Sequence, residues 1–172
     1  MKQLLLLAVL LTNFFSFAQH SFPESWIGNW KGELEIVAPA SGAVQAKFPM
    51  EIKIGTTEKA GEWSWTIIYN HKDVRNYLLR MKDKSRGLYE IDELNKIVLD
   101  LAVFGNTTVS SFEVDKMRIV DFHELKDGKM YFSLISYNES QTNLSGSGTA
   151  EIPTVKSNVV TAMQRAVLER EK

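Results

Sequence analysis

The sequence predicts an all-β protein, an antiparallel up-and-down barrel of about ten strands that closes on itself and carries a C-terminal helix. Two observations support this fold class. Apolar and polar residues alternate with a period of two through most of the chain after residue 30, which is typical of half-buried strands. Short turns containing Gly, Asn or Asp separate the alternating runs, as in a meander of hairpins. Because an open meander leaves its edge strands unpaired, we expect the barrel to close.

The first 18 residues have the pattern of an export signal. Lys2 precedes an apolar run over residues 4–11, and small residues near position 18 favour cleavage after Ala18. A membrane-spanning helix needs about 20 consecutive apolar residues, and polar residues at 12 and 13 interrupt this run. We therefore expect a signal peptide over 1–18. The exported chain, periplasmic or secreted, would be a single barrel domain over 19–172 with no transmembrane segment.

Composition narrows the function classes. The chain has no Cys, three His and a formal net charge of −1. Without Cys it can form no disulfide and carry no lipid anchor on an N-terminal Cys. A nearly balanced charge argues against a nucleic-acid partner. The His residues are isolated in the sequence, so we expect no metal and no other cofactor. A haem needs only one axial His, so His123 as a haem ligand stays an open alternative.

The first two strands follow directly from the alternation. One strand begins near Trp30, where apolar positions alternate with Lys31, Glu33 and Glu35. A second strand spans residues 44–54, with Pro49 on its outward side. A proline lacks the N–H that a sheet interior requires, so this position indicates a bulge or an edge.

The turns from residue 69 to residue 128 predict how the later strands pair, because a slip of one residue would turn every side chain to the other face. Odd-length loops at 69–74, 83–87 and 92–96 give three pairs of inward residues: Ile67 with Tyr77, Met81 with Tyr89, and Ile91 with Ile97. Two-residue turns at Gly105-Asn106, Asp115-Lys116 and Asp127-Gly128 give three more: Leu101 with Ser110, Phe112 with Ile119, and His123 with Phe132. One continuous apolar face results.

The C-terminal region changes character. A tenth strand is expected within Thr142–Ile152, where two glycines permit bending or close backbone approach. Residues 158–170 are expected to form a helix, since apolar positions fall at helical spacing on one face. The alternative is a final strand, because Val159 and Val160 favour β-structure.

The residues before the first strand resemble those of a known superfamily. Residues 22–27 look like a short helical plug, followed by Gly28-Asn29-Trp30 at the start of the strand. This arrangement is similar to that of the calycins, the lipocalins and fatty-acid-binding proteins. The resemblance implies a barrel that binds a small molecule, with Trp30 inward at the closed end. The sequence departs from the family in two respects: no Arg is identified that packs on this Trp, and the disulfide common in lipocalins is impossible.

Five polar residues interrupt the apolar inward face: Thr108, Ser110, Asp121, His123 and Ser136. The predicted registers make Ser110 a neighbour of Asp121, and Thr108 a neighbour of His123. Buried polar groups are costly unless they are hydrogen-bonded. The cluster is therefore a self-satisfied network around buried water, a site for the polar end of a ligand, or a catalytic group that uses Ser110, Asp121 and His123.

The sequence thus predicts an exported, lipocalin-like protein that binds a small apolar or amphipathic ligand inside the barrel. The residues expected to bind it are Thr108, Ser110, Asp121, His123, Trp65, Tyr77 and Tyr89. The first alternative is a dry-cored envelope or secreted interaction protein without a ligand. A hydrolase-like enzyme that uses Asp121 and His123 is the second alternative. The oligomeric state stays open.

Overall fold

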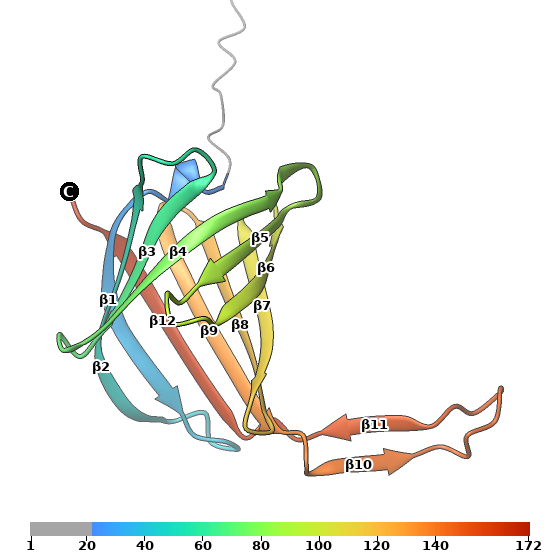
Figure 1. Cartoon of the computed structure of the whole chain (residues 1–172). Coiled ribbons are helices and arrows are strands. Elements are labelled where there is room, and N and C mark those ends of the chain that lie inside the picture. Colours follow the sequence, from blue (N-terminus) through green and yellow to red (C-terminus); the bar gives the residue numbers. More distant parts are fainter. Residues whose placement is uncertain (1–21) are drawn as a thin grey trace, which may run out of the picture.

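The computed structural model describes residues 22–172 and contains a closed barrel of ten antiparallel strands (Figure 1). Strands β1 to β9 pair consecutively, and β12 closes the ring between β9 and β1. The expected fold class is confirmed. The elements are η1 (Glu24–Trp26), β1 (Gly28–Val37), β2 (Val44–Thr56), β3 (Glu62–Tyr69), β4 (Asp73–Asp83), η2 (Lys84–Arg86), β5 (Leu88–Asp92), β6 (Val98–Phe104), β7 (Thr107–Val114), β8 (Met117–Lys126), β9 (Lys129–Asn138), β10 (Thr142–Ser145), β11 (Val155–Asn158) and β12 (Ala162–Arg170). The expected signal peptide, residues 1–18, lies outside the described residues.

The expected C-terminal helix is wrong, because residues 162–170 form strand β12. Ala166 and Leu168 are buried on the inner side, whereas Met163 and Val167 are exposed. On one side β12 pairs with β1, and on the other it pairs with β9. Both edges of the nine-strand meander need a hydrogen-bonding partner. This requirement outweighs the helical spacing of apolar residues and selects the strand that was the alternative.

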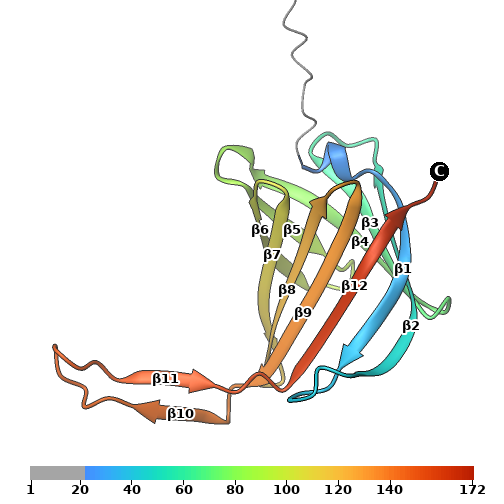
Figure 2. The ribbon, with the colours of Figure 1, turned by 180° about the vertical axis from the view of Figure 1, so that it is seen from behind.

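The expected tenth strand within Thr142–Ile152 is also placed differently. Strand β10 pairs only with β11, and the two form a ribbon that projects from the barrel (Figures 1 and 2). Its tip does bring backbone close to backbone, as expected from the two glycines. A Cβ atom on Gly146 would lie 2.0 Å from the carbonyl oxygen of Pro153. We call residues 139–161 the arm.

Most of the expected strand registers are confirmed. The pairs Met81–Tyr89, Leu101–Ser110, Phe112–Ile119 and His123–Phe132 lie opposite one another as expected. Two pairs are shifted by two residues, since Trp65 lies opposite Tyr77 and Ile91 lies opposite Leu99. A shift of two residues preserves the inward face, which is why the apolar pattern alone does not detect it.

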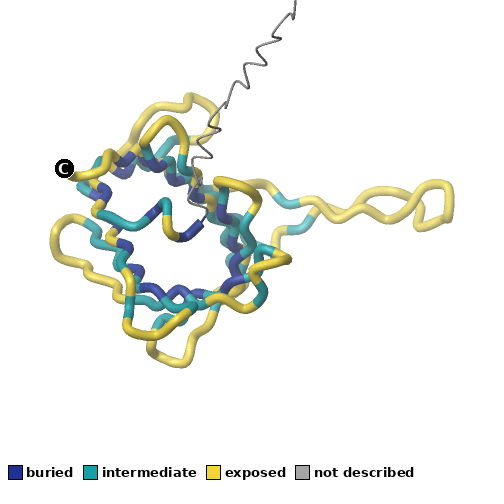
Figure 3. The backbone as a smooth tube through the Cα atoms, turned by 90° about the horizontal axis from the view of Figure 1, so that it is seen from above, coloured by how far each residue is buried: buried dark blue, intermediate teal, exposed yellow. Residues whose placement is uncertain are grey.

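One end of the barrel is closed by the plug before β1. Phe22 and Trp26 are buried, and the plug lies inside the ring of strands when the barrel is viewed along its axis (Figure 3). The indole N–H of Trp30 donates to the carbonyl oxygen of Trp26 at 2.8 Å. Trp30 is fully buried, as the resemblance implies. The β6–β7 and β8–β9 turns lie at this closed end.

Burial differs between the two halves of the barrel interior. In the half next to the plug, which we call the closed half, inward residues are buried: Trp30, Leu34, Met50, Ile52, Leu79, Met130 and Leu168. In the other half, the open half, inward residues remain partly exposed: Phe48, Ile67, Leu99, Phe112, Ile119 and Leu134. Four of them, Phe48, Ile67, Leu99 and Leu134, pack against the core and are only partly buried. Inward side chains are therefore most deeply buried near the plug, whereas apolar side chains toward the other end keep part of their surface exposed.

Candidate functional site

Asp121 lies between the two halves of the lumen, on the inner face of β8. Its cross-strand partners are Ser110 on β7 and Leu134 on β9. Burial raises the pKa of the Asp121 carboxyl from 3.8 to about 6, although the backbone amides of Ser110 and Asp121 partly oppose the rise. No Lys, Arg or His among the described residues forms an ion pair with it. Asp121 is therefore a lumen carboxylate without a cationic partner in the described protein.

His123 and Thr108 lie deeper, in the closed half. They are cross-strand partners on β8 and β7, and both are almost fully buried. Burial lowers the pKa of His123 to about 4, so its imidazole is neutral at pH 7. Its ring packs against Trp65 and Phe132, with ring centres 5.4 and 5.0 Å away. The His123 Nε2 and Thr108 Oγ1 atoms find no hydrogen-bond partner within the described protein.

The side chains of the five polar residues form no hydrogen bonds with one another in the described protein. Ser110 Oγ donates to the backbone oxygen of Asp100 at 2.8 Å, and two of the other side chains are left unpaired. Among the described residues no hydrogen bond joins Ser110, Asp121 and His123 as a nucleophile, an acid and a base. Such contacts are the geometry that a triad requires. The protein groups alone therefore form neither the self-contained network nor the triad that the sequence left open.

The three aromatic residues of the expected ligand site lie at different depths. Trp65 and Tyr89 are buried in the closed half, where the Tyr89 ring packs edge-on against Phe22 with ring centres 5.0 Å apart. Tyr77 is only partly buried and faces the open half. The structure thus brings Tyr77 and Asp121 to the accessible lumen, while Trp65, Tyr89, Thr108 and His123 line its packed floor.

Sequence reasoning missed Arg75, which lies on the inward face of β4 at the open end, two residues before Tyr77. Arg75 lies opposite Ile67, and its guanidinium carbon is 5.2 Å from the centre of the Tyr69 ring. It is already paired with Asp73, at 2.9 Å between Nη2 and Oδ2. Burial raises the pKa of Tyr69 to about 12, and the charge of Asp121 adds to this rise. The alternation along β4 could have placed Arg75 on the inward face, because it lies two residues from Tyr77; only its cross-strand partner depends on the length of the β3–β4 turn.

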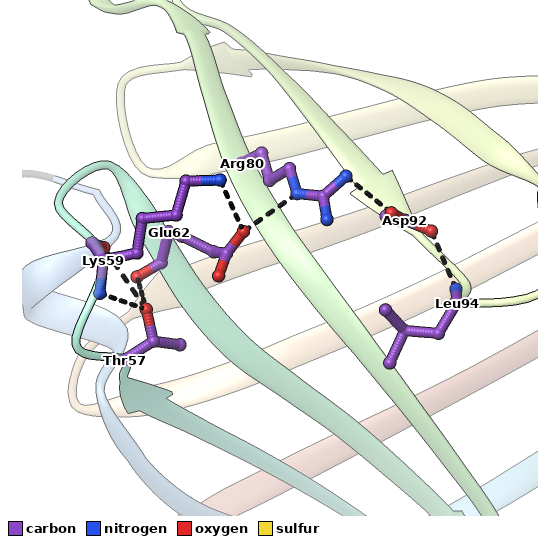
Figure 4. A network of polar contacts seen from close by, with 6 residues as sticks. All are labelled: Thr57, Lys59, Glu62, Arg80, Asp92 and Leu94. Atoms are coloured by element: carbon purple, nitrogen blue, oxygen red, sulfur yellow. Dashed lines mark hydrogen bonds and ion pairs between the residues drawn. The ribbon is translucent and has the colours of Figure 1, made fainter.

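Two other basic residues of β4, Arg80 and Lys82, form ion pairs on the outer surface of the barrel. Arg80 bridges Glu62 on β3 and Asp92 on β5, at 2.9 and 2.5 Å (Figure 4). Lys82 pairs with Asp100 at 2.8 Å. These ion pairs lie on the face away from the lumen, so Arg80 and Lys82 are not partners for a group inside the barrel.

Two hollows lie outside the lumen. One, of about 530 Å³, is on the outer face of β1, β9 and β12 beside Glu35 and Arg165. The other, of about 350 Å³, is at the closed end between Phe22, η2 and Tyr89. Among residues 22–172 no three His, Cys, Asp or Glu side chains converge as metal ligands, and no helix is long and apolar enough to cross a membrane.

Comparison with known proteins finds the fold but no family. No family model matches the chain, and no curated protein does. A protein of unknown function from the DUF3598 family of Nostoc punctiforme has 10% identity and a TM-score of 0.62, over 86% of this chain and 48% of that one. The chain thus spans about half the length of that protein. A mutant of the fluorescent protein UnaG has 13% identity and a TM-score of 0.48, over 87% of this chain and 98% of that one.

Proposed function

We propose that the protein is an exported calycin-like barrel that holds a small amphipathic molecule in the open half of its lumen. One observation carries the proposal: inward apolar side chains of the open half stay partly exposed, and they end at the Asp121 carboxyl. Small-molecule sites are usually concave and mostly apolar, with a few placed polar groups. The likeness to the DUF3598 structure supports the barrel fold and carries no ligand with it.

Native mass spectrometry of the protein purified from its source organism tests the proposal. We expect a mass excess of a few hundred daltons at most that disappears on denaturation. A matched pair of variants locates the site. Ile119→Trp fills the open half from β8, whereas Val120→Trp adds the same bulk to the outer face of the same strand. Only the first should lose the ligand. A bare mass, unchanged after incubation with a lipid extract, would contradict the proposal.

Export is the second part of the proposal, and its support is the pattern of residues 1–18. Intact-mass analysis of cell fractions tests it. The periplasm or the medium should contain a chain that begins at residue 19, whereas a full-length chain in the cytoplasm would contradict export.

The arm favours the alternative function, an interaction protein. Leu144, Val155 and Val159 are exposed on it, and an isolated two-stranded ribbon is only marginally stable in water. Replacing residues 141–157 with a short Gly/Ser turn tests this alternative. If the protein acts through the arm, the shortened variant keeps its fold but loses function in the cell.

A further inference from the structure

We propose that the lumen selects ligands with a cationic, ammonium-type head group, which pairs with the carboxylate of Asp121. This inference rests on the proposed function and names the chemical class of its ligand. It begins from the surroundings of Asp121. The neighbouring strands contribute Ser110 and Leu134, and β8 itself contributes Ile119 and His123, none of which carries a positive charge at pH 7.

The other charged groups near this part of the lumen do not compensate Asp121. Arg75 lies at the open end and is held by Asp73. Tyr69 stays protonated at neutral pH, since burial raises its pKa. An ionised carboxylate that is largely removed from water, without a cation or a full set of donors, is costly. Burial is the dominant influence on the pKa of Asp121, and no neighbouring cation offsets it.

Three classes of head group can be compared on this basis. A carboxylate or phosphate head would bring a second negative charge against Asp121. A hydroxyl head would donate one hydrogen bond and leave the charge uncompensated. An ammonium carries three N–H donors, no acceptor and the opposite charge, and charge-assisted hydrogen bonds are about twice as strong as neutral ones. Only the cation removes the desolvation cost of Asp121.

The deeper polar atoms fit the same class. Thr108 Oγ1 and His123 Nε2 are buried and find no partner in the described protein. Inward positions two apart on a strand are separated by about 7 Å, so His123 follows Asp121 one step toward the floor. A hydroxyl oxygen and the unprotonated nitrogen of a neutral imidazole both accept hydrogen bonds. These acceptors lie beneath an ammonium held at Asp121 and favour a cationic head over an anionic one at that depth, and the apolar chain of the ligand would lie against Phe112 and Leu99 toward the open end.

Binding of three single-chain molecules of equal length tests the inference: dodecylamine, dodecanol and dodecanoate, each below its micelle concentration at pH 7.5. We expect the amine to bind about tenfold more tightly than the alcohol, as one hydrogen bond to a charged group permits. Asp121→Asn should reduce this preference to about twofold or less. The control is Glu124→Gln, which removes one negative charge from the outer face of the same strand and should keep the preference.

Wild-type protein provides a second measurement that does not depend on the folding of a variant. Pairing with an ammonium favours the ionised carboxyl, so bound dodecylamine should lower the pKa of Asp121 in an NMR titration, and dodecanol should not. Equal affinities for amine and alcohol, or a preference for dodecanoate, would overturn the inference and leave the proposed function intact. No binding of any of the three, with no effect of Ile119→Trp, would overturn the proposed function.

Discussion

The guanidinium carbon of Arg170 lies 4.4 Å from the centre of the Trp30 ring, and the two residues are cross-strand partners on β12 and β1. Arg170 Nη2 also donates to the carbonyl oxygen of Ser25 at 2.6 Å. One side chain thus joins the last strand, the first strand and the plug. The sequence did not reveal that an Arg packs on this Trp.

Arg170→Ala should lower the free energy of unfolding by about 1–2 kcal/mol, because it removes a cation–π contact and a charged hydrogen bond at the closure of the barrel. Urea denaturation measures the effect. Arg165→Ala is the control, since Arg165 lies on the same strand but pairs with Glu35 on the exposed outer face. Its loss should cost less than about 1 kcal/mol. Equal losses would contradict a special role for Arg170.

Gly32→Ala should destabilise the barrel by about 1–3 kcal/mol, because a Cβ atom there would lie 2.2 Å from the backbone oxygen of Val167. Strands β1 and β12 would have to move apart. Gly55→Ala is the matched control on β2, where the added Cβ would meet only the Ser64 hydroxyl at 2.9 Å. That side chain can rotate away. Thermal unfolding should show a much larger decrease in Tm for Gly32→Ala, and a reversed order would be inconsistent with this close approach.

Asp121→Asn should stabilise the unliganded protein above pH 6 by about 1–3 kcal/mol. Burial raises the pKa of Asp121 from 3.8 to about 6. Between pH 4 and pH 6 the carboxyl is therefore protonated in the folded state and ionised in the unfolded state. The wild type therefore loses stability from this group as the pH rises from about 4 to 6. Asn has no charge to bury. The difference in unfolding free energy between variant and wild type should grow over this window and then level off; a flat difference would exclude the raised pKa.

His123→Leu should have the opposite pH dependence. Burial lowers the pKa of His123 from 6.5 to about 4, so between these values the unfolded state binds a proton that the folded state does not. The wild type loses stability from this group as the pH falls through the window, and Leu does not. The free energy of unfolding of His123→Leu, relative to that of the wild type, should therefore increase as the pH falls toward 4. His71→Leu, on an exposed residue, controls for the loss of a His. If the amine head group reaches this depth, His123→Leu also weakens dodecylamine binding.

Replacing residues 141–157 with a short turn should change the stability of the barrel by less than about 1 kcal/mol. The two arm strands pair only with each other. The ion pair between Arg118 and Glu139 at the base of the arm lies outside the deleted segment, which removes only hydrogen bonds such as that of the Thr142 hydroxyl to the Glu139 carbonyl oxygen. Urea denaturation checks this expectation. A large loss would mean that the arm supports the barrel rather than extending from it.

The meander of the barrel was predictable because turn residues and the alternation of apolar and polar residues act between neighbours in the sequence. The two-residue turn at Asp115-Lys116 specifies both the β7–β8 hairpin and its register, and this is why the neighbours Ser110–Asp121 and Thr108–His123 were placed correctly. The longer turn between β3 and β4 specifies less. The resulting shift of two residues kept the apolar face but changed the cross-strand partner of Arg75 from Tyr69 to Ile67.

The sequence by itself determined the nine-strand meander, its inward face, the plug and the polar cluster, because alternation and turn chemistry act over a few residues. Only the tertiary structure decided which segment closes the barrel, that Arg170 covers Trp30, and that Asp121 has no cationic partner while Arg75 is paired with Asp73. These features depend on residues far apart in the chain. Residues 162–170 are compatible with a helix until the free edges of β1 and β9 are present to hydrogen-bond them.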